Sequence, residues 1–81
     1  MDDDRPLTYD MLRQTARDAY RDGNATQVEL AQALDVSQSS VSQALATTGP
    51  KFAHLQRRII EHLTPYEVVE EVRFYLRRPR P

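Results

Sequence analysis

The chain has 81 residues, of which 28% are charged, and its formal net charge is −1. A chain of this length forms a single small domain with a modest core, and because it contains no cysteine, disulfides and thiolate metal sites are excluded. No apolar run approaches the roughly 20 residues of a membrane span, and no signal-peptide pattern follows Met1. We therefore expect a soluble cytoplasmic protein.

The charges are divided unevenly along the chain. Residues 1–35 contain eight acidic side chains and four arginines, whereas residues 36–81 contain seven basic side chains and four acidic ones. No acidic residue occurs between Asp35 and Glu61, and the basic residues in that stretch are Lys51, Arg57 and Arg58. Such a basic field suits a polyanionic partner, although ordinary solvated helix charge explains it equally well.

The first predicted helix begins at Thr8, after an acidic segment, residues 1–6, that we expect to be flexible. Thr8 can cap a helix running to about Arg21. Gly23-Asn24 is expected to end this helix in left-handed or turn conformations. The predicted inward face consists of Met11, Leu12, Ala16, Ala19 and Tyr20.

Two short helices follow in quick succession, and together they form a predicted helix-turn-helix at residues 27–45. Thr26 and Glu29 have the spacing of a capping box at the start of the first one. That helix ends at Asp35, and Ser37 then caps another from Gln38 to about Ala46. The predicted inward residues of the pair are Val28, Leu30, Ala31, Leu34, Val36, Val41, Ala44 and Leu45.

The helix that begins at Gln38 has an unusual outward face. Residues 36–45, VSQSSVSQAL, contain four serines, two glutamines and no charged residue. Glu and Lys would favour solubility and helix formation more, whereas Gln and Ser can form hydrogen bonds with base edges in the major groove of DNA. The helical repeat turns four of these side chains toward solvent, and we predict that they read bases: Gln38, Ser39, Ser42 and Gln43.

Attraction to phosphate is expected from side chains around this helix. The amino end of the helix that starts at Gln27 has a positive dipole and can hold a phosphate through Thr26 and Gln27. Basic side chains further along can neutralise other phosphates. The predicted phosphate-binding residues are Thr26, Gln27, Ser37, Lys51, His54, Arg57 and Arg58.

A fourth helix is predicted from Pro50 to Leu63. Its inward stripe is Phe52, Leu55, Ile59, Ile60 and Leu63, with Arg57, Arg58 and Glu61 outside. We expect Phe52, Leu55 and Ile59 to supply most of its buried area.

The tail that follows, YEVVEEVRFYLRRPRP, is compatible with two structures. Its density of Val, Phe and Tyr favours a strand, whereas the Thr64-Pro65 start with Glu67 favours a fifth helix. We favour the strand or hairpin. In either case residues 65–77 are expected to pack on the core or to pair with a second chain. The predicted dimerisation residues are Val68, Val72, Phe74, Tyr75 and Leu76.

The stretch QVELAQALDVSQSSVSQAL resembles the helix-turn-helix of the lambdoid phage repressor and Cro proteins and their bacterial relatives. The resemblance implies a mainly α, four-helix domain and sequence-specific binding to double-stranded DNA by a bacterial or phage-type, nucleoid-associated protein. It implies that four residues of the second short helix contact bases, namely Gln38, Ser39, Ser42 and Gln43. It also implies that Gln27 contacts a phosphate and supports the side chain of Gln38. Two positions depart from the family, since Asp35 replaces the usual glycine and Gln43 is often basic in Cro proteins.

We therefore expect a transcription regulator, a homodimer that places two recognition helices in major grooves about 34 Å apart. The alternative is an antitoxin-like or adaptor module that binds a partner protein through the same fold. An enzyme is not expected, because no catalytic constellation or phosphate-cradling glycine loop is present. His54 and His62 are too few for a zinc site, and we expect no cofactor and no small-molecule ligand.

Overall fold

The computed structural model describes residues 7–69 of the chain. These residues form four α-helices and one 3₁₀ helix, and the residues 7–69 contain no strand, so this part of the protein is mainly α, as predicted. None of its helices is long and apolar enough to cross a membrane. The elements are α1 (Tyr9–Asp22), α2 (Gln27–Leu34), α3 (Gln38–Ala46), η1 (Pro50–Phe52) and α4 (Ala53–Leu63).

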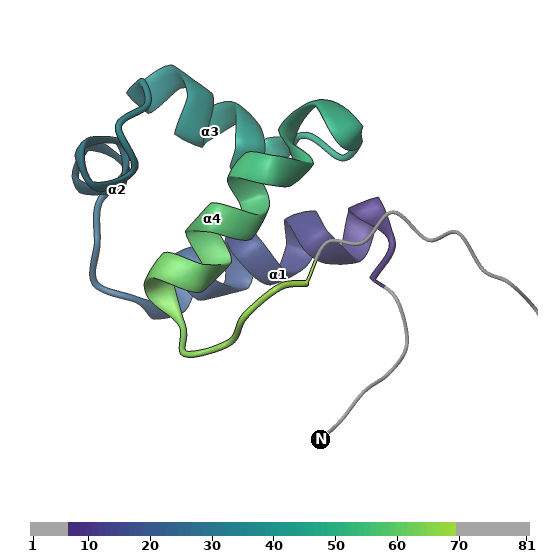
Figure 1. Cartoon of the computed structure of the whole chain (residues 1–81). Helices are drawn as coiled ribbons and strands as arrows, with labels where there is room; N and C mark the ends of the chain where they lie inside the picture. Colours follow the sequence, from purple (N-terminus) through teal and green to yellow (C-terminus); the bar gives the residue numbers. More distant parts are fainter. Residues whose placement is uncertain (1–6, 70–81) are drawn as a thin grey trace, which may run out of the picture.

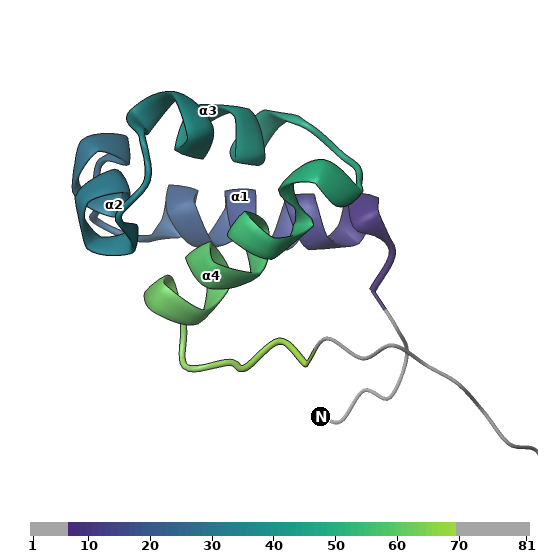
Figure 2. The same ribbon diagram turned by 45° about the horizontal axis from the view of Figure 1, so that its top comes forward.

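Helices α1 and α4 pack against each other, and α3 lies on one side of this pair (Figure 1). In the same view α2 is seen nearly end-on while α3 runs across the top, so the axes of these two consecutive helices cross steeply. Residues 64–69 run on the opposite side of the α1–α4 pair from α3, as the rotated view also shows (Figure 2). The described part of the tail therefore leaves the outer side of α3 uncovered.

The predicted caps set the starts of the helices. In the reciprocal capping box of α2, the Glu29 N–H donates to Thr26 Oγ1 at 3.1 Å, and the Thr26 N–H donates to Glu29 Oε1 at 2.9 Å. The Ser40 N–H donates to Ser37 Oγ at 3.0 Å at the start of α3, and Thr8 caps α1 in the same way. Each bond satisfies a backbone N–H that has no partner in the first helical turn. These caps confirm the predicted starts of α1, α2 and α3.

Asp35 makes the tight turn between α2 and α3. Its backbone is left-handed, with φ of 60° and ψ of 47°. The Val36 N–H donates to the Ala31 carbonyl at 3.0 Å across this turn, which satisfies a carbonyl at the end of α2. Aspartate tolerates the left-handed region better than most residues, so the fold keeps the turn without glycine. Gly23, in contrast, is extended, with φ of −93°, and the chain bends after α1 without a left-handed residue there.

The core lies between all four α-helices. Within residues 7–69 it contains one buried polar side chain, Gln56, whose exposed fraction is 0%. The buried apolar residues are Leu12, Ala16, Leu30, Ala31, Leu34, Val41, Ala44, Leu45, Ile59 and Ile60.

Two residues that we predicted to face the core are exposed. Met11 is 43% exposed and Val28 is 47% exposed. Each lies about a third of a turn from the centre of the buried side of its helix, and no neighbouring helix covers it. The prediction that they belong to the core was therefore wrong. Ala19 and Tyr20 are half-buried, and Tyr20 packs against the core.

The fourth predicted helix differs in detail from expectation. It begins as the 3₁₀ turn η1 before α4 starts at Ala53. Phe52 and Leu55 are only half-buried, and the most buried residues of α4 are Ile59, Ile60 and Gln56. The three charged residues expected outside are half-buried as well, namely Arg57, Arg58 and Glu61.

Residues 65–69 form neither the predicted strand nor a helix. Val68 packs against the core of its own chain, and its N–H donates to Glu61 Oε2 at 2.9 Å. The acidic segment 1–6 and the tail from residue 70 onward lie outside the described residues. The same is true of the remaining predicted dimerisation residues, Val72, Phe74, Tyr75 and Leu76.

Candidate nucleic-acid interface

The outward side of α3, here called the polar face, consists of Gln38, Ser39, Ser42 and Gln43. All four side chains are exposed, and none of them forms a side-chain hydrogen bond with another residue in the range 7–69. The opposite side of α3 is buried through Val41, Ala44 and Leu45. The orientation that we predicted for these residues is therefore present. Their amide and hydroxyl groups are available to a ligand that approaches α3 from solvent.

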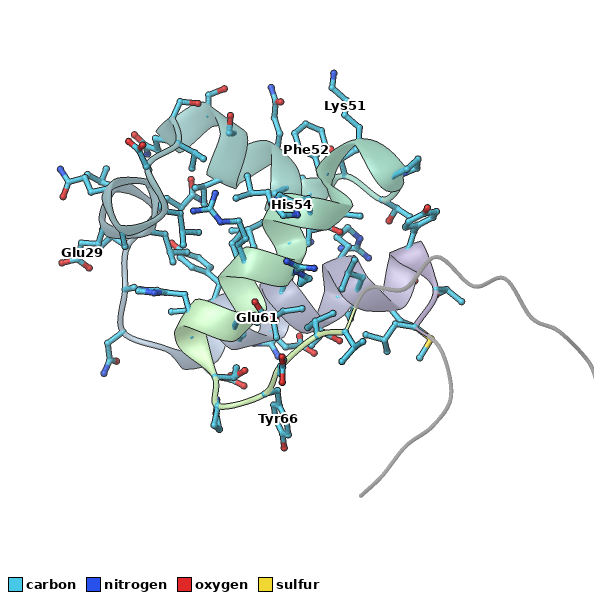
Figure 3. The ribbon with its side chains drawn as sticks, viewed as in Figure 1. Glu29, Lys51, Phe52, His54, Glu61 and Tyr66 are labelled. Carbon is cyan, nitrogen blue, oxygen red and sulfur yellow. The ribbon has the colours of Figure 1, made fainter. Side chains whose placement is uncertain are left out.

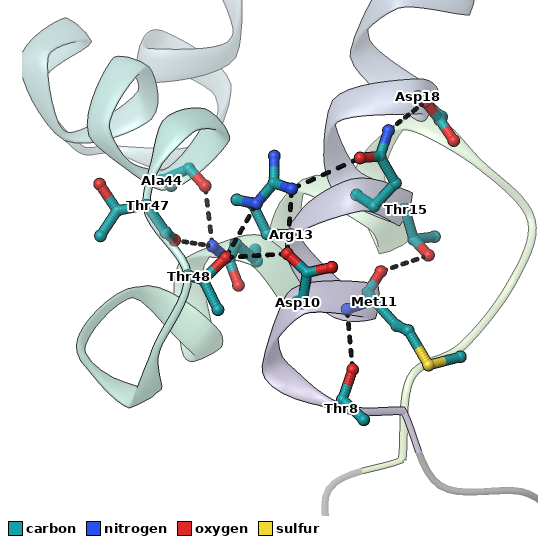
Figure 4. Close-up of polar contacts among 11 residues, drawn as sticks. Thr8, Asp10, Met11, Arg13, Thr15, Asp18, Ala44, Thr47 and Thr48 are labelled. Atoms are coloured by element: carbon teal, nitrogen blue, oxygen red, sulfur yellow. Dashed lines mark hydrogen bonds and ion pairs between the residues drawn. The ribbon is translucent and has the colours of Figure 1, made fainter.

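The carboxyl end of α3 is attached to α4 by a residue that we did not predict. Gln56 Nε2 donates to the carbonyls of Ala44 and Thr47, each at 2.8 Å (Figure 4). These carbonyls belong to the last turn of α3 and its cap, where helical partners are lacking. The available signal was positional, because Gln56 lies three and four residues before Ile59 and Ile60 and so falls on the inward stripe. Its Oε1 atom is buried without a hydrogen bond to the described residues.

The end of α2 is attached to α4 in a similar way. Arg58 Nη2 donates to the Leu34 carbonyl at 2.8 Å in a partly buried position. This bond satisfies a carbonyl at the carboxyl end of α2 and places a positive charge where the helix dipole is negative. Arg58, which we predicted to bind phosphate, thus has an internal partner next to the turn at Asp35.

We expect Arg58→Met to lower the free energy of unfolding by about 1–2 kcal/mol, because hydrogen bonds to charged groups contribute roughly 1.5–3 kcal/mol and this one is partly exposed to solvent. Urea denaturation followed by circular dichroism measures the change. The control is Arg21→Met, since Arg21 is 65% exposed and pairs with Asp18 on the surface of α1. Unchanged stability with weaker binding to every DNA sequence would instead support the phosphate contact.

The amino end of α2 is partly occupied by its own capping box. The Thr26 N–H and the Glu29 carboxylate are engaged with each other, and Glu29 points away from α3 (Figure 3). Gln27 is half-buried. No hydrogen bond joins Gln27 to Gln38 in the described residues, so the support of Gln38 by Gln27 stays a prediction for the DNA-bound protein.

Ser37 uses its hydroxyl group within the chain. Ser37 Oγ accepts the Ser40 N–H and donates to Ser40 Oγ at 2.9 Å. Because both bonds serve the start of α3, this hydroxyl group is less available to a phosphate than the sequence suggested.

The predicted basic contacts lie on η1 and α4. Lys51 is exposed, with its Nζ atom 5.6 Å from the centroid of the Phe52 ring, and it points away from the body of the protein on the side of α3 (Figure 3). His54 is exposed and Arg57 is half-buried. Lys51 is therefore the predicted cation placed most clearly beside the polar face.

The loop that follows α3 is attached to α1 by three polar side chains. Arg13 Nε donates to Thr48 Oγ1 at 2.9 Å, Arg13 Nη2 donates to Asp10 Oδ1 at 3.1 Å, and Thr48 Oγ1 donates to Asp10 Oδ1 at 3.2 Å (Figure 4). The hydrogen bonds from Arg13 and Thr48 lower the pKa of Asp10 below its ordinary value. This cluster fixes the path of the chain between α3 and Lys51.

A surface pocket of about 270 Å³ lies beside the polar face. Three helices line it. Helix α1 contributes Arg17 and Tyr20, α2 contributes its first residue, Gln27, and α3 contributes Ser42 together with an apolar floor. The sequence did not indicate Arg17, because Gln27 and Ser42, the polar residues beside it in the pocket, belong to other helices. The floor residues are Leu45 and Ala46.

The chemistry available on this side of the protein is hydrogen bonding with a few positive charges. Among residues 7–69 no group of three His, Asp or Glu side chains is placed to hold a metal ion. The surface instead combines uncharged donors and acceptors on α3 with Arg17 and Lys51 at its edges. Comparison of this chain with protein-family models, with curated proteins and with solved structures found no match.

Proposed function

We propose that the protein is a transcription regulator that binds double-stranded DNA in a sequence-specific manner, with α3 in the major groove. The observation that carries this proposal is the polar face, whose four side chains are exposed and have no hydrogen-bond partner in the described residues. Glutamine amides can pair with the N6 and N7 groups of adenine, and serine allows a close approach of the backbone.

The attachment of α3 supports this role. Ser37 caps its first turn and Gln56 binds its last carbonyls, so the helix is fixed at both ends before DNA arrives. A fixed surface loses little conformational entropy on binding. The steep crossing of α2 and α3 (Figure 1) also agrees with the helix-turn-helix arrangement, which residues 27–45 resemble in sequence.

We further propose that two copies of the chain bind one DNA site. One recognition helix covers only part of a turn of duplex, and a two-fold-symmetric pair places two such helices in grooves about 34 Å apart. Phosphate contacts from Gln27 and Lys51 orient each copy. The tail, residues 65–77, stays the predicted dimer contact, although Val68 packs against the core of its own chain.

Salt-dependent DNA binding tests this function. We expect the protein to retard a pool of random duplexes in a gel shift, with an affinity that falls steeply between about 50 and 200 mM salt, because phosphate contacts release counterions. Selection from the same pool is expected to yield a two-fold-symmetric sequence and its half-site spacing. Absent or salt-insensitive retardation would favour the adaptor alternative, in which the fold binds a partner protein.

A further inference from the structure

We propose that the pocket between α1, α2 and α3 binds one phosphodiester group of the DNA backbone, with Arg17 as its charged ligand. This proposal rests on the proposed function and extends it to a residue on α1, outside the helix-turn-helix. The contact fixes how deeply and in which register α3 enters the groove, because a phosphate contact positions a protein without reading sequence.

The polar lining of the pocket suits an anion. The pocket is an open surface depression of about 270 Å³, large enough to admit a phosphate group, and its polar side chains determine which ligand it favours. The Arg17 guanidinium, the Gln27 amide and the Ser42 hydroxyl can all donate hydrogen bonds there. These three donors come from three different helices.

Arg17 differs from Arg13, Arg21 and Arg58 in having no partner among residues 7–69. Arg13 is paired with Asp10, Arg21 with Asp18, and Arg58 with a backbone carbonyl. Arg17 forms no ion pair or hydrogen bond within residues 7–69. A planar guanidinium with free donors can bind two phosphate oxygens at once. Its charge is therefore available at the pocket.

The electrostatics of α2 explain why an arginine is needed here. The positive end of the α2 dipole attracts an anion, but the Glu29 carboxylate already lies at that end and binds the Thr26 N–H. Because this carboxylate repels a phosphate, the helix end alone is a weak site. Arg17 supplies a compensating charge beside Gln27, on the side of α2 that faces α3.

The pocket is also close enough to the polar face to control its position. Ser42 lines the pocket and lies one turn after Gln38 on the same side of α3. A phosphate held at Ser42 is thus within about one helical turn, roughly 5.4 Å along the axis, of the first base-reading residue. This geometry assigns Ser42 to the boundary between backbone contact and base reading.

The test compares Arg17→Gln with Arg21→Gln in the full-length chain. Both variants remove one positive charge from an exposed site on α1, so their long-range electrostatic effects are matched. We expect Arg17→Gln to weaken binding to the selected duplex and to random DNA alike, by about tenfold, and to reduce the log–log salt slope by about 1. Arg21→Gln is expected to change neither, and Arg17→Lys is expected to restore the slope.

A scan of the selected duplex with single methylphosphonate groups locates the contact. One neutralised position in each half-site is expected to weaken the wild-type protein but not Arg17→Gln. Equal weakening by Arg17→Gln and Arg21→Gln, or an unchanged scan in Arg17→Gln, would overturn the pocket assignment while DNA binding by the wild type stands. If the wild type binds no DNA, the proposed function fails first and this inference with it.

Discussion

Gln56→Met is expected to lower the free energy of unfolding by about 2–3 kcal/mol, because it removes the donor that two backbone carbonyls share. A buried acceptor left without a partner costs roughly 1–3 kcal/mol. The Ala44 carbonyl is bonded in a buried position, whereas the Thr47 carbonyl is partly buried and can reach water. The loss of the buried, unpaired Oε1 atom offsets a small part of the cost.

Such a loss is large for this protein. Domains have roughly 0.05–0.15 kcal/mol of stability per residue, which for a chain of 81 residues gives about 4–12 kcal/mol. Urea denaturation followed by circular dichroism measures the change, with Gln32→Met as the control because Gln32 is exposed on α2. The control is expected to stay within about 0.5 kcal/mol of the wild type. Equal stability of the two variants would show that Gln56 does not hold the end of α3.

Gln38→Ala is expected to weaken binding to the preferred duplex by about 1–3 kcal/mol, the usual contribution of one bidentate base contact. Binding to random DNA is expected to change little, because Gln38 carries no charge and adds nothing to counterion release. Its side chain is exposed and has no internal hydrogen bond in the described residues, so the fold loses nothing by the change.

Fluorescence anisotropy with the selected and a scrambled duplex measures both affinities for Gln38→Ala. Gln32→Ala is the matched control, since it makes the same chemical change on the exposed surface of α2. If Gln38→Ala keeps the wild-type preference between the two duplexes, α3 does not read bases through its first residue. A loss of affinity for both duplexes in equal measure would point to a phosphate contact instead.

The local features of the fold could be predicted from the sequence because they depend on neighbouring residues. The capping box needs only Thr26 and Glu29 at the right spacing, and Ser37 meets the backbone of its own helix. The tight turn between the two short helices was also predictable, whereas the left-handed backbone of Asp35 was implied only by the resemblance, in which a glycine usually occupies this position. The outward orientation of the polar face was predictable for the same reason, since the helical repeat fixes it once the buried side is known.

Features that depend on how the helices meet could not be predicted. Val28 is apolar, yet no helix covers its side of α2. Gln56 falls on the inward stripe of α4, but the sequence does not show that it binds carbonyls at the end of α3, nor that Arg58 binds the Leu34 carbonyl of α2. The pocket at Arg17 exists only where three helices converge. Nothing in the spacing of these residues along the chain identifies their partners.

Helix α4 holds its two neighbours by their main chains. Gln56 and Arg58 bind carbonyl oxygens of Ala44, Thr47 and Leu34, and every amino acid carries such an oxygen. The side chains that point outward from α2 and α3 can therefore be exchanged without disturbing these anchors. A library randomised at the polar face would keep one common scaffold, so that new binding preferences can be grafted onto it while the molecule remains folded.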